Sequence, residues 1–260
     1  MSKVFNPICC SRVFLTLFGL FLASNALAQS CPIPFRSASI ATFGVPVCAV
    51  ERVSDRALDH AATVMETLLD YDRDGKPDNP RVLETLVSSG SFYAVFRNER
   101  EIDRFFNGLD DHEHDRYETA ITVMEDEMDI TGRDGWDPTV EEALHLITQF
   151  GYAALYPSVF GEMKGSEIAD LMDQARGGYF RRVPNRYPKG AYFTYDDRSC
   201  DYRCQVTEFT FWAITSLRGL HNNRRQDIED EWKLNTAEKM RSKAPELVAL
   251  LERPEFNILF

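Results

Sequence analysis

The segment D-P-T-V-E-E-A-L-H, residues 137–145, constrains this chain more than any other, because it predicts a helix and the contents of one helix face. Asp137 suits the N-cap and Pro138 suits the first turn, which together set the register of the residues that follow. Glu141 and His145 are four residues apart and therefore share a face. A carboxylate and an imidazole on one helix face are typical of a metal site.

The helix is expected to run from Pro138 to about Leu155, with Pro157 ending it. Turning each residue by about 100° separates a polar arc from an apolar one. The polar arc contains Glu141, Glu142, His145, Thr148, Gln149 and Tyr152. This arc is either a solvated helix face, since Glu/His pairs at this spacing also arise by chance, or one wall of a site. The second interpretation requires a further ligand from elsewhere in the chain.

Glu208 is the candidate for that ligand, because it sits in a largely apolar helix expected from about 206 to 220. A buried carboxylate needs a partner, since an unpaired buried charge is costly. A metal, an arginine or a histidine would each serve, and three arginines lie upstream: Arg176, Arg181 and Arg182. A zinc-like site made by Glu141, His145 and Glu208 would leave one coordination position for water. Glu142 would then stand where a general base is required.

The order of these elements carries a resemblance to a known family. A strand, an E-E-x-x-H helix, a Tyr-rich segment and a helix with a lone Glu resemble the zincin metallopeptidases, with the first His of H-E-x-x-H replaced by Glu141. The segment Y-F-T-Y, residues 192–195, followed by Glu208 is similar to the anthrax lethal factor type. The resemblance implies that Glu142 is the base and that His145 and Glu208 are zinc ligands.

The same resemblance implies that Tyr192 or Tyr195 steadies the oxyanion of the reaction. The carboxylate at Glu141 makes the ligand set more anionic than the family pattern. Such a site holds the proton of a bound water more tightly and admits harder metals than zinc.

The chain is also similar to secreted proteins of uncharacterised activity that share four short segments. These are E-E-x-L-H-L-I-T, F-G-E, Y-x-T-Y-D-D and T-E-x-x-x-W-A, at residues 141–148, 160–162, 192–197 and 207–213. That similarity implies a shared fold and brings no established activity with it.

A second candidate metal site lies in the acidic loop D-Y-D-R-D-G-K-P-D, at the start of residues 70–81. The pattern D-x-D-x-D-G is that of an EF-hand-like calcium loop, in which alternate residues supply oxygen ligands and Gly permits a sharp turn. The twelfth position is Arg81, so the usual bidentate Glu is missing. The calcium-binding residues are expected to be Asp70, Asp72, Asp74, Lys76 and Asp78. The alternative is an acidic helix-capping turn without metal.

The first 28 residues are expected to be an export signal. Lys3 and Arg12 supply positive charge, an apolar run extends from 13 to 22, and the small residues A-L-A at 26–28 suit cleavage. The run is too short to span a bilayer, which needs about 20 residues. Removal of Lys3 and Arg12 changes the formal charge from −12 to −14, so nucleic acid and anionic membranes are poor partners. We therefore expect a secreted or periplasmic protein without a membrane anchor.

Four of the six cysteines remain after removal of the signal. An even number in an oxidising compartment favours disulfides. Three pairings are open, and the lower entropy of closing short loops favours the local ones. The expected disulfides are Cys31–Cys48 and Cys200–Cys204.

These observations predict a helix-dominated α+β fold for residues 29–260, a single domain with a zincin-like core and a small antiparallel sheet. The two clearest strands are at 91–96 and 120–124. The leading function is an exported metal-dependent hydrolase, a peptidase in which Glu142 activates a metal-bound water, acting on a peptide or protein. The alternative is a non-catalytic secreted metal- or calcium-binding protein with the same fold. A third possibility is a glycosidase that uses Glu141 or Glu142 together with Glu208.

Overall fold

The structure is a computed structural model that describes residues 30–37, 43–133 and 135–258. The predicted signal peptide, residues 1–28, lies outside these described residues. Within them, no helix has the length and apolar character needed to cross a membrane.

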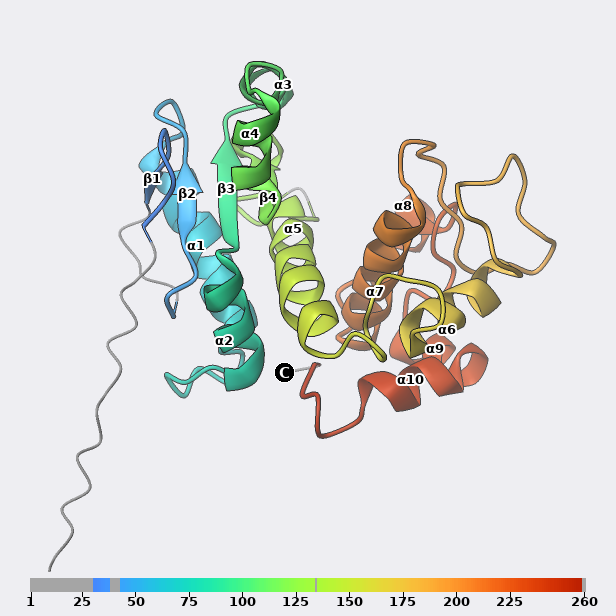
Figure 1. The fold of residues 1–260 in the computed structure, drawn as a ribbon. Helices are drawn as coiled ribbons and strands as arrows, with labels where there is room; N and C mark the ends of the chain where they lie inside the picture. Colours follow the sequence, from blue (N-terminus) through green and yellow to red (C-terminus); the bar gives the residue numbers. More distant parts are fainter. Residues whose placement is uncertain (1–29, 38–42, 134, 259–260) are drawn as a thin grey trace, which may run out of the picture.

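A small sheet forms the centre of the N-terminal half of the molecule (Figure 1). Its strands follow their sequence order, β1-β2-β3-β4, and β2, β3 and β4 are parallel. Among the described strands of this sheet, the two-residue β1 alone pairs antiparallel, at one edge. The strand bounds are β1 Arg36–Ser37, β2 Val47–Ala49, β3 Phe92–Phe96 and β4 Ala120–Met124.

The prediction of a zincin-like core with a small antiparallel sheet is therefore wrong in its strand directions. Helices fill both intervals between the parallel strands: α1 Asp55–Leu69 and α2 Pro80–Ser89 in the first, α3 Glu99–Phe106 and α4 Asp111–His114 in the second. Parallel neighbours require such crossovers, whereas antiparallel neighbours can be joined by a tight hairpin. The helical spacing between the two predicted strands already favoured parallel pairing. The prediction of a helix-rich chain with a small sheet is correct.

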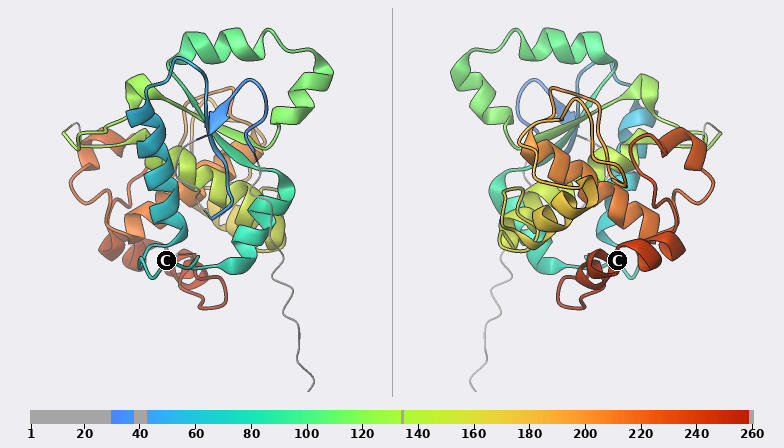
Figure 2. Two further views of the ribbon diagram at one scale, coloured as in Figure 1. Left: turned by 90° about the vertical axis from the view of Figure 1, so that its left-hand side faces the viewer. Right: turned by 90° about the vertical axis from the view of Figure 1, so that its right-hand side faces the viewer.

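The long helices α1 and α5 pack against each other and against the sheet. Ser54 caps α1 by accepting a hydrogen bond from the backbone N–H of Ala57. Figure 2 shows α1 running beside the strands, while Figure 1 shows α3 and α4 at one end of the sheet. The helix α5, Pro138–Leu146, begins after Asp137, whose carboxylate accepts from the N–H of Thr139 at 3.1 Å.

The α5 helix changes its hydrogen-bonding pattern one residue after Leu146. Residues Ile147–Ala153 form a π-helix, a rare form that occurs most often near functional sites. The predicted helix to Leu155 is therefore continuous but not regular. Thr148 is buried and donates to the carbonyl of Leu144, and Tyr152 donates to the carbonyl of Asn257. A regular helix had predicted that both side chains line a polar wall of the site. In the structure neither does, because each donates to a backbone carbonyl instead.

The C-terminal half consists of helices and connecting loops, with no β-strand among its described residues. Its central helix α7, Tyr202–Leu217, is buried on most sides, which explains its many aromatic residues. The other helices of this half are α6 Glu167–Arg176, α8 Arg225–Ile228, α9 Ala237–Lys243 and α10 Pro245–Leu251. Of these, α6, α9 and α10 pack against α7. Two short 3-10 helices, Asp115–Tyr117 and Glu125–Glu127, flank β4 in the other half.

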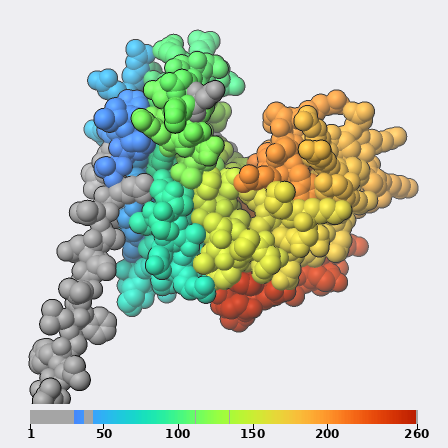
Figure 3. Space-filling model, viewed as in Figure 1, coloured from blue at the N-terminus to red at the C-terminus, as the bar shows by residue number. Residues whose placement is uncertain are grey.

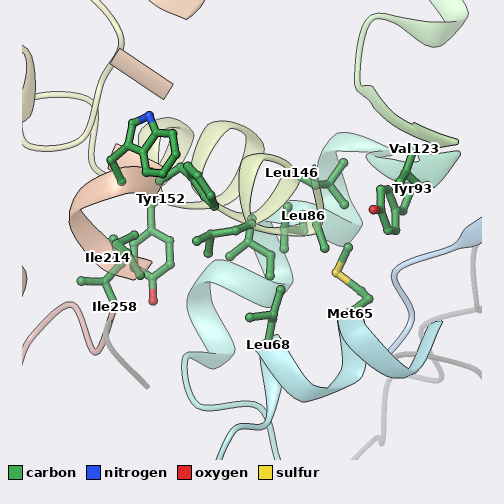
Figure 4. Close-up of a cluster of buried hydrophobic side chains, with 14 of the residues drawn as sticks. Met65, Leu68, Leu86, Tyr93, Val123, Leu146, Tyr152, Ile214 and Ile258 are labelled. Carbon is green, nitrogen blue, oxygen red and sulfur yellow. The ribbon is translucent and has the colours of Figure 1, made fainter. Parts of the chain in front are cut away.

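One hydrophobic cluster joins the two halves (Figure 4). Met65 of α1, Leu146 of α5 and Ile214 of α7 belong to it, and each is at most 1% exposed. Tyr93 of β3 packs in the same cluster, and its hydroxyl donates to the carbonyl of Thr139 in α5. The sheet therefore fixes the first turn of α5 both by packing and by a hydrogen bond.

Both local disulfides predicted from the sequence are present. Cys31–Cys48 ties the segment before β1 to β2, with Cα atoms 5.7 Å apart. Cys200–Cys204 links the residue before the N-cap of α7 to its first turn, with Cα atoms 5.3 Å apart. Such bonds persist in oxidising compartments, so they are consistent with an extracellular protein.

The π-helix packs so closely on α2 that we expect Gly151→Ala to destabilise the protein. A Cβ at position 151 would lie 2.7 Å from Cγ1 of Val82, which is buried and stiff at χ1. Overpacking of this kind costs about 1–3 kcal/mol of unfolding free energy, measurable by urea denaturation. The control Ala154→Ser, on the exposed side of the same segment, should stay within about 0.5 kcal/mol of wild type. Equal stability of the two variants would contradict the close α2 contact.

Candidate metal centre

The helices α5 and α7 lie side by side and bring three predicted ligands together (Figure 1). Glu141 and His145 come from α5, and Glu208 comes from the second turn of α7. One ligand atom from each lies within 4.8 Å of the other two. The distance from Nε2 of His145 to Oε1 of Glu208 is 3.4 Å. A tetrahedral metal with ligand bonds of about 2.0–2.2 Å needs ligand atoms about 3.4 Å apart, which matches the separation of this pair.

The partner of Glu208 is His145 and not an arginine. Arg176, the one fully buried arginine of the three that had been considered, binds Asp173 and the side-chain oxygen of Gln205. Two nitrogens of its guanidinium are thus engaged away from Glu208, while its Nε has no hydrogen-bond partner among the described residues. The alternative of a buried Glu208–Arg pair is therefore not realised with this residue.

His145 is buried, and packing holds its ring. The ring of Phe211 meets it edge to face at a centroid distance of 5.5 Å. Its Nδ1 is buried and has no hydrogen-bond partner among the described residues. Metal-bound histidines usually have a partner for the second nitrogen, so this ring is oriented by contact with Phe211 instead.

The charges around His145 favour its cationic form. Burial by itself lowers the pKa of an imidazole, but the carboxylate of Glu208, through its charge and a hydrogen bond, reverses that effect. The charges of Glu142 and Glu141 act in the same direction and bring the pKa to about 9. Three carboxylates thus surround one imidazole, and a bound cation would take the place of the proton.

A hydrogen bond from Trp136 holds Glu141. The indole Nε1–H of Trp136 donates to Oε2 of Glu141 at 3.3 Å. Burial raises the pKa of Glu141 to about 6, against the lowering charge of His145. Glu208 adds to the rise, while the Trp136 hydrogen bond and the charge of Arg224 oppose it.

Glu142 is half-buried one helical turn before His145 and makes no hydrogen bond to another described residue. Burial raises its pKa to about 7; the nearby imidazole lowers it, and Glu141 and Glu208 raise it further. A carboxylate with a pKa near neutrality has the proton affinity that a general base needs at that pH.

Tyr192 and Tyr195, the two tyrosines predicted to steady the oxyanion, lie in different surroundings in the structure. Tyr195 borders the larger cleft beside Glu208, and burial followed by the charge of Glu208 raises its pKa well above the ordinary value. Tyr187 fixes the Tyr195 backbone, because its hydroxyl bonds both the N–H and the carbonyl of Tyr195. Tyr192 lies elsewhere, with its ring against Trp232, and burial followed by the charge of Glu246 raises its pKa to about 12. Of the two, only Tyr195 is placed near the centre.

Two clefts reach the three ligands from different sides. The larger, about 1110 Å³, is bordered by Glu141, Glu208, Tyr195 and the acidic segment 227–231. The smaller, about 630 Å³, is bordered by His145, Gln149 and Glu208. Figure 3 shows a hollow between the green segment around residues 100–125 and the orange segment around 190–210.

Sequence reasoning missed three residues that shape the site: Trp136, His221 and Arg224. Arg224 lies over the indole ring of Trp136 at 4.4 Å from its centroid, and His221 packs on the same ring. Trp136 directly precedes the helix cap, so its place in the sequence could have indicated a role near the site. His221 and Arg224 are distant from α5 in sequence, and the residues around them form no pattern that indicates a site.

The acidic loop between α1 and α2 holds three carboxylates close together. Asp70, Asp72 and Asp74 each have an oxygen within 4.8 Å of the other two. The N–H of Asp74 donates to both of the other carboxylates, at 3.1 and 3.0 Å. Asp78 instead accepts from the N–H of Tyr71, and the ammonium group of Lys76 pairs with Asp74 at 3.1 Å. Three of the five predicted calcium-binding residues are thus gathered.

No family model matches the chain, and neither a curated protein nor a solved structure matches it.

Glu231 gives the larger cleft a measurable pH dependence. Burial raises its pKa from 4.5 to about 7, and the charges of Asp196, Glu208, Glu141 and Asp230 add to the rise. The folded state therefore binds this proton more tightly than the unfolded state. The stabilisation that protonated Glu231 gives to the folded state is present below pH 4.5 and is lost as the pH rises through 7.

We expect Glu231→Gln to be more stable than wild type at pH 8, by on the order of 1 kcal/mol once solvent screening is included. The two proteins should converge near pH 4.5. Thermal unfolding across this range measures the difference, with the exposed Glu229→Gln as the control. A constant difference between Glu231→Gln and wild type at every pH would contradict the shifted pKa.

Proposed function

We propose that this protein is an exported metal-dependent hydrolase of the peptidase kind, secreted or periplasmic. The observation that carries the proposal is the cluster of Glu141, His145 and Glu208, whose ligand atoms lie within 4.8 Å of one another where two clefts meet. Buried carboxylates gathered around an imidazole are costly without a cation.

The donor set fits a divalent metal. One imidazole nitrogen and two carboxylate oxygens suit zinc, and the second carboxylate also suits harder metals. A metal held by these residues supplies Lewis-acid polarisation of water and of a substrate carbonyl. The disulfides and the predicted signal support a place outside the cytoplasm.

Two further residues have roles that follow from their chemistry. Glu142, with its pKa near neutrality, accepts the proton of the attacking water and returns it to the leaving amine. Tyr195, whose raised pKa keeps the hydroxyl protonated, donates a hydrogen bond to the oxyanion. The clefts on either side of the ligands suit a peptide or protein chain rather than a small molecule.

A non-catalytic, calcium-stabilised protein is the second candidate function, and the carboxylate cluster of Asp70, Asp72 and Asp74 favours it. Like charges this close repel one another unless a cation neutralises them. We propose that calcium bound there stabilises the turn between α1 and α2, whether or not the protein is an enzyme.

We expect the mature wild-type protein to bind about one transition metal per chain and His145→Ala to bind none, as elemental analysis will show. Glu142→Gln should retain the metal but lose hydrolysis of a mixed peptide library by at least about a hundredfold, the scale of general-base catalysis. Glu246→Gln, an exposed change on α10, is the matched control. Retained hydrolysis in Glu142→Gln would reject the base assignment. A wild type that takes up no metal would favour the non-catalytic function.

Calcium at a hundredfold excess over its Kd should stabilise the wild type by about 2.7 kcal/mol, seen as a higher Tm. Asp74→Ala should lose this gain, because it removes one of the three clustered carboxylates. Asp103→Ala, an exposed position on α3, should keep it. An equal calcium response in both variants would exclude the loop as the binding site.

A further inference from the structure

We infer that Trp136 is a positioning residue that fixes the Glu141 carboxylate as a metal ligand; the inference rests on the metal centre proposed above. The indole Nε1–H donates to Oε2 of Glu141 at 3.3 Å. A donor to one carboxylate oxygen restricts the rotation of the group and directs the other oxygen. Among the three ligands, Glu141 is the one that departs from the imidazole of the H-E-x-x-H pattern, and it is longer and more flexible than an imidazole.

The indole is itself held firmly on several sides. Phe211 packs on it edge to face at a centroid distance of 5.7 Å, and His221 packs at 5.1 Å. The guanidinium of Arg224 lies 4.4 Å from the indole centroid, a cation–π contact that favours this ring orientation. The donor therefore reaches Glu141 from a ring with little freedom to turn.

A chain of hydrogen bonds fixes Arg224 in turn. Its guanidinium donates to Nδ1 of His221 at 3.2 Å, which sets the tautomer with hydrogen on Nε2. That Nε2–H donates to the hydroxyl of Thr215 at 2.7 Å, and the hydroxyl donates to the carbonyl of Phe211. The hydrogen bonds that join Thr215, His221 and Arg224 therefore order the indole of Trp136. Such groups support a metal ligand indirectly, by fixing the residue that bonds to it.

Trp212 offers an internal comparison. It packs on the same two rings, Phe211 and His221, at centroid distances of 5.0 Å each. Its Nε1 is buried but has no hydrogen-bond partner among the described residues. The two indoles thus share their surroundings and differ in whether the N–H meets a ligand.

The test is a competition titration of the mature protein with zinc against a chelator, together with the visible spectrum of the cobalt-loaded protein. Trp136→Phe should weaken zinc binding by about 10- to 100-fold, the usual effect of losing a ligand's supporting hydrogen bond. It should also shift the cobalt bands, because Glu141 changes its orientation. Trp212→Phe, which removes an unpaired N–H from the same cluster, should change neither.

A second variant separates the effect of losing the N–H from the effect of losing packing at position 136. β-(3-Benzothienyl)alanine keeps the bicyclic shape of Trp but has no N–H, so it should weaken zinc binding as Trp136→Phe does while leaving the Tm of the metal-free protein unchanged. Zinc bound equally tightly by wild type and by the benzothienyl variant would overturn the positioning role and leave the metal centre standing. A wild type that binds neither zinc nor cobalt would overturn both.

Discussion

The structure depends on the buried contact between α5 and α7, where His145 lies 3.4 Å from Glu208. Each charge would be costly alone in this interior, and their attraction offsets part of that cost. The pair is not a simple stabilising ion pair, because Glu141 and Glu142 add negative charge beside it. This excess of carboxylate is better explained by cation binding than by the needs of packing, since apolar residues would join the two helices at lower cost.

Phe211 connects the parts of this arrangement. Its ring contacts the imidazole of His145 on α5 and the indole of Trp136 ahead of that helix. Phe211 also lies less than one turn after Glu208 on α7, so one aromatic side chain connects the two helices that carry the proposed ligands. The imidazole ring of His145 is oriented by aromatic packing, as its unpartnered Nδ1 also indicates.

The sequence predicted the local features well and the long-range ones poorly. The bounds of α1, β4 and the start of α5 follow from caps and periodicity, and the pairing of cysteines follows from short loops. Strand direction was wrong, because it depends on how crossover helices pack and not on the strands themselves. The π-helix after Leu146 was missed, since the close approach of Val82 to Gly151 is a tertiary contact. His221 and Arg224 reach the site from a distant segment, which periodicity does not reveal.

The ligands of the centre are far apart along the chain, with about sixty residues between His145 and Glu208. Each helix alone offers too few groups to retain an ion, so the complete ligand set exists only after the two halves have docked. Under the proposed function, a chain still unfolded for export would therefore carry no metal, and its loading would follow folding outside the cytoplasm. The metal available in that compartment, rather than the one most abundant at the site of synthesis, would then decide what the protein contains.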